Sequence, residues 1–174
     1  GSDLNSIGTV VDKEVAAQAW ELEDGSSFEC DLGFKESPMF GKPFHFKGLI
    51  EGHCKYGPVI DPSDIKRVYD FGKRVVLRSG NARIMVMEHA GCGHSPYIYT
   101  SAGYNIGDFD VVCVRSALQY REPYKGMYSE AIVVDSPGAS SPDLCSLPFN
   151  DIVWEAYPLN KNAEFIPHTK LSVR

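Results

Sequence analysis

The sequence predicts an α/β fold, with a single domain built on a mixed, partly parallel β-sheet and an α+β arrangement as the alternative. Three observations lead to this prediction. An amphipathic segment after Asp12 indicates a helix, and two apolar runs around a Gly-Asn pair indicate a β-hairpin over 74–88. Two further apolar runs near 110–135 indicate buried parallel strands. A chain of 174 residues is long enough to form one domain with its own hydrophobic core.

The first elements follow from local patterns. Asp12 is a suitable N-cap for the segment KEVAAQAWELEDG, whose apolar residues recur at helical spacing and which ends at Gly25. Residues 27–34 alternate apolar and polar side chains, and residues 44–54 carry aromatic and aliphatic ones in β-like fashion. Both segments are predicted to be half-buried strands.

The hairpin over 74–88 has the clearest pattern, RVVLRSGNARIMVME, in which Gly80-Asn81 can adopt the positive φ angles of a tight turn. After it, the stretch from Ser95-Pro96 to Gly103 predicts a short helix or turn.

A βαβ unit is predicted near 110–135. DVVCVRS (110–116) and IVVDSPG (132–138) are nearly continuous apolar runs, and REPYKGMYSEA (121–131) is the expected crossover helix. Cys113 is then expected to be a buried structural thiol. Five prolines after Ser136 predict an irregular C-terminal wrap. We expect a domain over 3–160 and an irregular tail over 161–174.

Composition excludes several classes of function. A net charge of −6 and the absence of a Lys/Arg cluster argue against a nucleic-acid partner. No apolar run approaches the roughly 20 residues that cross a bilayer, so we expect a cytoplasmic protein without a membrane partner. Gly1-Ser2 is typical of a cleaved expression tag. The five scattered cysteines include no CxxC pair, which indicates reduced thiols.

The heptapeptide EHAGCGH (88–94) has the density of ligands that suggests zinc. His89, Cys92 and His94 could converge if the intervening glycines let the loop curl, but the sequence identifies no fourth ligand. We therefore interpret the segment as a loop that leaves the preceding strand and keep these three residues as weak candidate ligands. No GxSxG or phosphate-binding glycine motif occurs, and we assign no catalytic residue.

Polar residues gather where the predicted strand 110–116 ends. Arg115, Ser116, Gln119 and Arg121 lie at the carboxyl end of that strand and in the following turn, which is where parallel sheets bind ligands. A guanidinium can hold a carboxylate through two hydrogen bonds. Asp135 ends the next predicted strand and could share the site. The alternative is that Arg121 packs against the crossover while Arg115 pairs with a surface acid.

Several of these segments together resemble the C-terminal domain of the microcystinase C (MlrC) family. They are LRSGNARIMVMEHAG, NIGDFDVVCVRSALQYREPY, IVVDSPGASSPDLCSLPF and the closing YPLN, and the similarity runs from Asp12 to Asn160. The family's motif Val-Lys-Ser-x-x-His-Phe-Arg is matched at Ser116 and Arg121, with Arg115 in place of the lysine and Gln119 in place of the histidine. Glutamine cannot exchange a proton near neutral pH, so binding could survive here where proton transfer would not.

The resemblance implies a zinc metallopeptidase or amidohydrolase of the kind that finishes the breakdown of linearised microcystin. It places the zinc ligands in a larger N-terminal domain, so we expect no cofactor in this domain and no hydrolysis by it alone. The implied partners are that catalytic domain, in the same polypeptide, and a peptide-like small substrate. The implied role is to form part of the substrate cleft or to pack against the catalytic domain. The alternative is a stand-alone module that binds a small anionic ligand or a protein partner.

Overall fold

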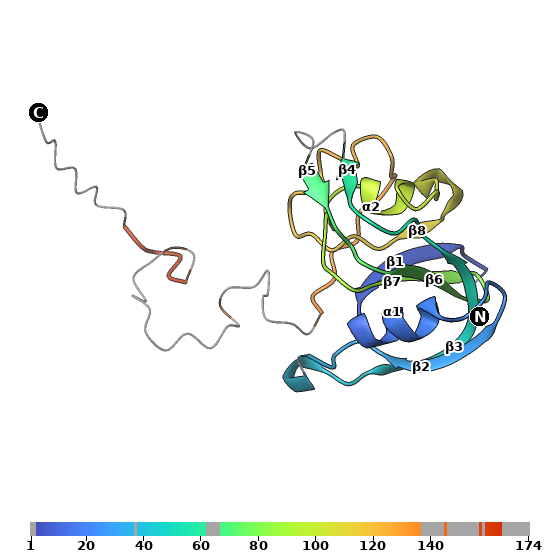
Figure 1. Ribbon diagram of the computed structural model, residues 1–174. Coiled ribbons are helices and arrows are strands. Elements are labelled where there is room, and N and C mark those ends of the chain that lie inside the picture. The colour runs from blue at the N-terminus through green and yellow to red at the C-terminus, as the bar shows by residue number, and fades with distance from the viewer. Residues whose placement is uncertain are drawn as a thin grey trace, which may run out of the picture. The chain divides into compact units, whose positions relative to one another are not determined.

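The computed structural model describes residues 3–36, 38–61, 67–136, 145, 157 and 159–164. Their main feature is a six-stranded mixed sheet, which confirms the predicted fold class (Figure 1). Its strands are β1 (Ser6–Val11), β2 (Ser27–Leu32), β3 (Phe44–His53), β6 (Arg74–Ser79), β7 (Ala82–Met87) and β8 (Val111–Val112). The remaining elements are a two-stranded sheet of β4 (Val59–Asp61) and β5 (Arg67–Tyr69), the helices α1 (Lys13–Trp20) and α2 (Tyr97–Thr100), and the 3₁₀ turns η1 (Pro38–Phe40) and η2 (Ile106–Asp108).

The six-stranded sheet has an antiparallel half and a parallel half. The strand order is β2-β3-β6-β7-β1-β8, with antiparallel pairing from β2 to β7 and parallel pairing of β1 with both β7 and β8. The β6–β7 hairpin is confirmed, and Gly80 in its turn has φ +58°. Sequence patterns did not predict β1, which supplies all the parallel pairing.

Side chains cover both faces of this sheet. On one face α1 packs against β2, β3 and β6; on the other, α2 and its adjoining loops pack against β1, β6 and β7. Figure 1 shows the two helices on opposite sides of the sheet. Strand β6 therefore alternates between two cores, with Val75 and Leu77 in the first and Val76 in the second. Burial on both faces explains why the run has no polar alternation.

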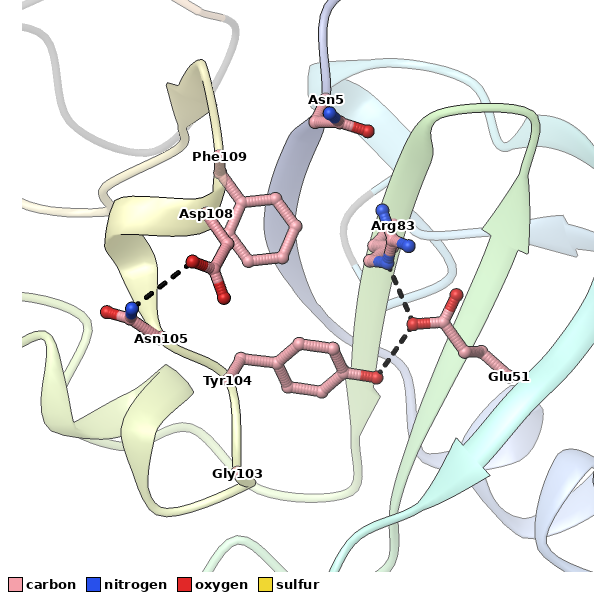
Figure 2. Close-up of a pocket in the computed structure, with 8 residues that line it drawn as sticks. All are labelled: Asn5, Glu51, Arg83, Gly103, Tyr104, Asn105, Asp108 and Phe109. Carbon is pink, nitrogen blue, oxygen red and sulfur yellow. Dashed lines mark hydrogen bonds and ion pairs between the residues drawn. The ribbon is translucent and has the colours of Figure 1, made fainter.

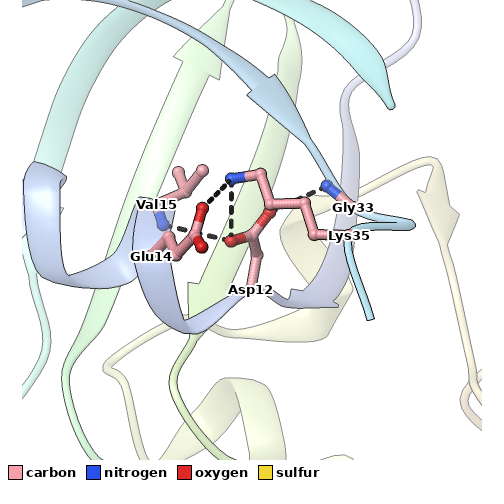
Figure 3. A network of polar contacts seen from close by, with 5 residues as sticks. All are labelled: Asp12, Glu14, Val15, Gly33 and Lys35. Atoms are coloured by element: carbon pink, nitrogen blue, oxygen red, sulfur yellow. Dashed lines mark hydrogen bonds and ion pairs between the residues drawn. The ribbon is translucent and has the colours of Figure 1, made fainter. Parts of the chain in front are cut away.

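Asp12 is the N-cap of helix α1, as predicted. The Asp12 carboxylate accepts hydrogen bonds from the backbone N–H of Val15 (3.1 Å) and of Gly33 (2.9 Å), and pairs with Lys35 Nζ at 3.2 Å (Figure 3). Lys35 also contacts Glu14 at 3.4 Å. Burial lowers the pKa of Lys35, but the hydrogen bonds and charges of Asp12 and Glu14 outweigh this and raise it. The N-cap therefore also holds the turn after β2 in place.

The described residues do not form the βαβ unit that was predicted near 110–135. Strand β8 has two residues instead of seven, residues 121–131 form turns and no helix, and residues 131–136 form no strand. Pro123 and Gly126, which has φ +77°, explain the missing helix because proline lacks the N–H that a helix interior requires and Gly126 is left-handed. Cys113 is exposed, not buried. Residues 137 and 138 of the predicted second strand lie outside the described residues.

The chain divides into two compact units, residues 1–133 and 134–174. The predicted C-terminal wrap and the 161–174 tail fall mostly outside the described residues and stay predictions. All five cysteines are free of disulfides, as predicted. In the described part of the chain no helix has both the length and the apolar character to cross a membrane.

Candidate functional site

One edge of the sheet brings together two segments that the sequence analysis treated separately. Because β1, β7 and β8 run in the same direction, their carboxyl ends meet at this edge. The loop 88–96 leaves β7 there, and the segment 113–121 leaves β8. The structure thus places Arg115 beside the EHAGCGH loop.

Arg115 lines a small cavity of about 110 Å³ at this edge. The other residues lining it are Thr9, Val11, Met87, Ala90, Gly91, Gly93 and Ile98. Apart from Arg115, these residues are apolar or carry a single hydroxyl. The lining contains no Asp, Glu, His, Lys or Cys side chain. The cavity walls therefore supply no general base.

The two glycines of the loop are explained by close packing. A Cβ atom on Gly91 would overlap the ring of Phe71, and one on Gly93 would lie 2.9 Å from the backbone oxygen of Arg115. The loop is also tied internally by hydrogen bonds from Gly93 N to Gly91 O (2.7 Å) and from Ser95 N to Cys92 O (2.9 Å). The glycines let the loop lie directly against Phe71 and Arg115.

Two of the candidate zinc ligands of this loop lie in different surroundings. Cys92 is buried in the second core cluster, whereas His89 is exposed to solvent. Among the described residues, no group of three or more His, Cys, Asp or Glu side chains is arranged to hold a metal ion. The expectation that this loop is not a metal site stays a prediction.

A buried tyrosine fixes the backbone just before Arg115. The hydroxyl of Tyr99 on α2 donates a hydrogen bond to the backbone oxygen of Cys113 at 2.5 Å. Burial, together with the neighbouring Tyr124 and Cys113, raises the pKa of Tyr99, so its hydroxyl stays protonated. The turn that carries Arg115 is therefore anchored to the core, while its side chain remains exposed.

The other predicted binding residues are only partly tested. Ser116 is half-buried, and Gln119 and Arg121 are exposed; none of the three side chains bonds to another described residue. Asp135 belongs to the second unit, so its predicted place beside Arg115 stays a prediction. The alternative that Arg115 pairs with a surface acid finds no such acid among the described residues.

Sequence reasoning missed a buried arginine, Arg74 on β6. Its guanidinium lies 4.6 Å from the centre of the Phe71 ring, and Nη1 donates to Ser101 Oγ at 2.9 Å. The Nε and Nη2 atoms are buried and make no hydrogen bond with the described chain. Burial lowers the pKa of Arg74. No local pattern marks it, because an arginine that begins a hairpin strand is usually exposed.

Comparisons with known proteins agree with this architecture. A protein from Mesorhizobium sp. BNC1, described as a candidate metallopeptidase, has a crystal structure that matches with a TM-score of 0.72 at 20% identity. The match covers 95% of this chain and 32% of that one, so the chain spans about a third of its length. No curated protein matches. The family model described as MlrC C-terminus matches residues 4–151. This chain therefore belongs to the MlrC family, in the part that forms its C-terminus.

Proposed function

We propose that this chain is the non-zinc-carrying C-terminal domain of an MlrC-type metal-dependent hydrolase. In that protein Arg115, with Ser116 and Arg121, binds the carboxylate or amide end of a peptide-like substrate at the wall of the active-site cleft. The zinc and the hydrolytic chemistry belong to an N-terminal domain of the same polypeptide.

The observation that supports this role is the position of Arg115. Arg115 lines a cavity at the carboxyl ends of parallel strands, where the backbone is anchored by Tyr99 and approached by the glycine loop. Such strand ends bind ligands in open α/β sheets. The lack of a general base in the cavity walls fits a binding role, and Gln119 fits it for the same reason.

The segment around Arg115 also supports packing between domains. Leu118, Met127 and Ile132 are exposed apolar side chains in the stretch that follows the edge strand β8. Exposed apolar surface of this kind commonly marks a contact with another protein part. The same segment would then contact the catalytic domain and present Arg115 to the cleft.

The test is to replace Arg115 with alanine in the protein that carries both domains. If Arg115 binds substrate, KM should rise about tenfold or more, because a charge-assisted hydrogen bond is lost, while the unfolding temperature stays the same. Lys125→Ala is the matched control. It removes an exposed cation from the same segment, whose nearest acid is Glu122 at 3.8 Å, and should leave KM unchanged.

Two other outcomes separate the alternatives. If KM is unchanged but the two domains unfold independently in the Arg115→Ala protein, the segment serves packing instead of substrate binding. If turnover and interdomain stability are both unaffected by Arg115→Ala and Arg121→Ala, the proposal is wrong. A stand-alone binding module would instead bind a small carboxylate, such as acetylated alanine, with the 174-residue chain alone and lose it in Arg115→Ala.

A further inference from the structure

The opposite edge of the sheet contains a second, larger cavity of about 300 Å³ (Figure 2). It lies where β1 and β7 begin, away from the edge that carries Arg115. The residues lining it are Asn5, Glu51, Arg83, Gly103, Tyr104, Asn105, Asp108 and Phe109. They come from the residue before β1, from β3 and β7, and from the stretch between α2 and β8. A cavity of this volume can hold a small organic molecule.

A pair of arginines shares one carboxylate at this cavity. Arg78 and Arg83 are direct partners in the β6–β7 ladder, and both contact Glu51 of β3. Arg78 Nε lies 2.9 Å from Oε2, and Arg83 Nε lies 2.8 Å from Oε1. Like charges directly opposite in a sheet repel each other, and Glu51 offsets this. Two guanidinium groups against one carboxylate leave a net positive charge.

The terminal nitrogens of Arg83 remain available. The ion pair with Glu51 uses Nε, and the Nη atoms make no hydrogen bond with the described chain. Figure 2 shows one of them directed toward the side of the cavity that Asn5 occupies. The Phe109 ring centre lies 5.5 Å from the guanidinium carbon and holds it from one side. Arg83 is therefore positioned to receive a second carboxylate on its Nη atoms.

Tyr104 forms the floor of the cavity and reinforces the arrangement. Its hydroxyl donates to Glu51 Oε1 at 3.0 Å, and its ring packs near that of Phe109 at 6.1 Å between centres. Burial and the negative charge of Glu51 raise the pKa of Tyr104, so it remains a donor. The two rings give the cavity an apolar surface between its charged walls.

The opposite wall is negatively charged. Asn105 Nδ2 donates to one oxygen of Asp108 at 3.2 Å, while Asn105 Oδ1 accepts from Gly107 N and fixes the turn η2. The second oxygen of Asp108 has no partner in the described chain. In Figure 2 Asp108 lies beside Asn105, on the other side of the Phe109 ring from Arg83. The site thus combines a cation, an anion and two aromatic faces.

We propose that this cavity binds a free α-amino acid. The carboxylate of the ligand bonds to the Nη atoms of Arg83, its ammonium group bonds to Asp108, and an apolar side chain packs against Tyr104 and Phe109. A ligand with only one charge would make a charge-assisted contact with either Arg83 or Asp108 but not with both, and would therefore bind more weakly. A zwitterionic amino acid can contact Arg83 with its carboxylate and Asp108 with its ammonium group.

This site is independent of the function proposed above. Strand β1 has six residues, so its two ends are about 15–20 Å apart at roughly 3.3 Å per residue. Arg115 lies beyond the carboxyl end, and Asn5 precedes the amino end. A variant at Arg115 should therefore leave amino-acid binding unchanged.

The experiment is an NMR titration of the isotope-labelled 174-residue chain with L-phenylalanine. Saturable shifts are expected for the amides of residues 103–109 and for Arg83. N-acetyl-L-phenylalanine lacks the ammonium group and L-phenylalanine amide lacks the carboxylate. Each should bind at least about tenfold more weakly, because each loses one charge-assisted contact.

Two isosteric variants identify the contact. Asp108→Asn keeps the acceptor for Asn105 and should weaken L-phenylalanine about tenfold while leaving the affinity for N-acetyl-L-phenylalanine unchanged. Asp110→Asn removes the same charge two residues away, outside the cavity lining, and should change neither affinity. Thermal unfolding of both variants checks that the fold is retained.

Three results would overturn the proposal. The first is the absence of saturable shifts in residues 103–109 up to about 10 mM ligand, a concentration well above the roughly millimolar range of weak small-molecule binding. The second is equal affinity for the three ligands. The third is an equal effect of Asp108→Asn and Asp110→Asn, which would indicate only a general response to charge.

Discussion

Strand β6 and the segment 132–134 have the same kind of sequence and opposite environments. In β6, Val76 and Leu77 are 1% and 0% exposed, whereas Ile132 and Val133 are 81% and 72% exposed. Strand β6 has a bonded strand on each side and a packed layer on each face. Within the described residues, Ile132 and Val133 have no strand partner.

This difference shows that an apolar run in the sequence indicates that a segment can be buried, but it does not identify the segment against which it packs. The run in β6 is followed by a turn and a second run, so its first partner is adjacent in sequence. The run at 132–134 has no such neighbour and depends on a distant one. The packing against another domain that we propose above would supply that partner.

The largest change in the free energy of unfolding is expected for leucine-to-alanine substitutions, which can be compared between β6 and the segment after β8. Leu77→Ala should lower the free energy of unfolding by about 2–5 kcal/mol, because it removes a fully buried side chain and leaves a cavity. Leu118→Ala, at an exposed position in the segment after β8, should change it by less than about 0.5 kcal/mol. Urea unfolding of the two variants measures both.

A large destabilisation by Leu118→Ala would contradict the difference in burial between β6 and the segment after β8. It would mean that the segment after β8 is packed in the isolated chain after all. If Leu118→Ala lowers the free energy of unfolding only in the protein that carries both domains, the other domain is the packing partner of this segment.

Local signals determined which elements could be predicted. Helix α1, helix α2 and the β6–β7 hairpin were predicted because their caps and turn residues are adjacent in sequence. Strand β1 was missed because Gly8 interrupts its pattern and its partners are about seventy or more residues away. Gly8 is itself explained by that distant contact, since a Cβ there would lie 3.3 Å from Cys113 Cβ.

The same limit applies to the sites. The place of Arg115 could be predicted because strand direction alone puts it at the carboxyl edge. Its approach to Gly93 could not, since two loops from different strands meet there. The cavity lined by Glu51, Arg83 and Asp108 could not be predicted, because these residues come from three segments that are far apart in the sequence and meet only in the folded chain.

The next prediction extends the comparison from apolar to charged side chains. Asp12→Ala should lower the free energy of unfolding by about 2 kcal/mol, because it removes an N-cap together with bonds to Gly33 and Lys35. Asp31→Ala, at an exposed carboxylate on β2, should have an effect below about 0.5 kcal/mol. Denaturant unfolding at neutral pH compares them.

The Asp12→Asn variant is the internal control for that prediction. Asparagine keeps the capping acceptor but removes the charge that pairs with Lys35, so it should retain about half of the stabilisation. If Asp12→Ala were no more destabilising than Asp31→Ala, the network of Figure 3 would not contribute to stability in solution.

The smallest change in the free energy of unfolding is expected for the exposed cluster of His45, Asp31 and Glu29 on β2 and β3, and this change depends on pH. His45 Nδ1 lies 3.0 Å from Asp31 and Nε2 lies 3.1 Å from Glu29. The hydrogen bond to Asp31 is the main cause that raises the pKa of His45 above its ordinary value of 6.5; slight desolvation opposes it, and Glu29 adds to it. NMR titration of the ring protons measures this pKa directly.

The sign of the stability effect follows from the raised pKa. The protonated ring is favoured in the folded state, so its contribution is fully present below the unfolded value of about 6.5 and is lost as pH rises through the folded value. The unfolding free energies of the original chain and of His45→Gln should therefore differ at pH 5.5 and converge by pH 9, with the difference reduced by added salt. A difference that grows with pH would show that the neutral ring makes the contacts. Because His45 stays open to water, even three close charges there should matter less than one buried leucine in β6.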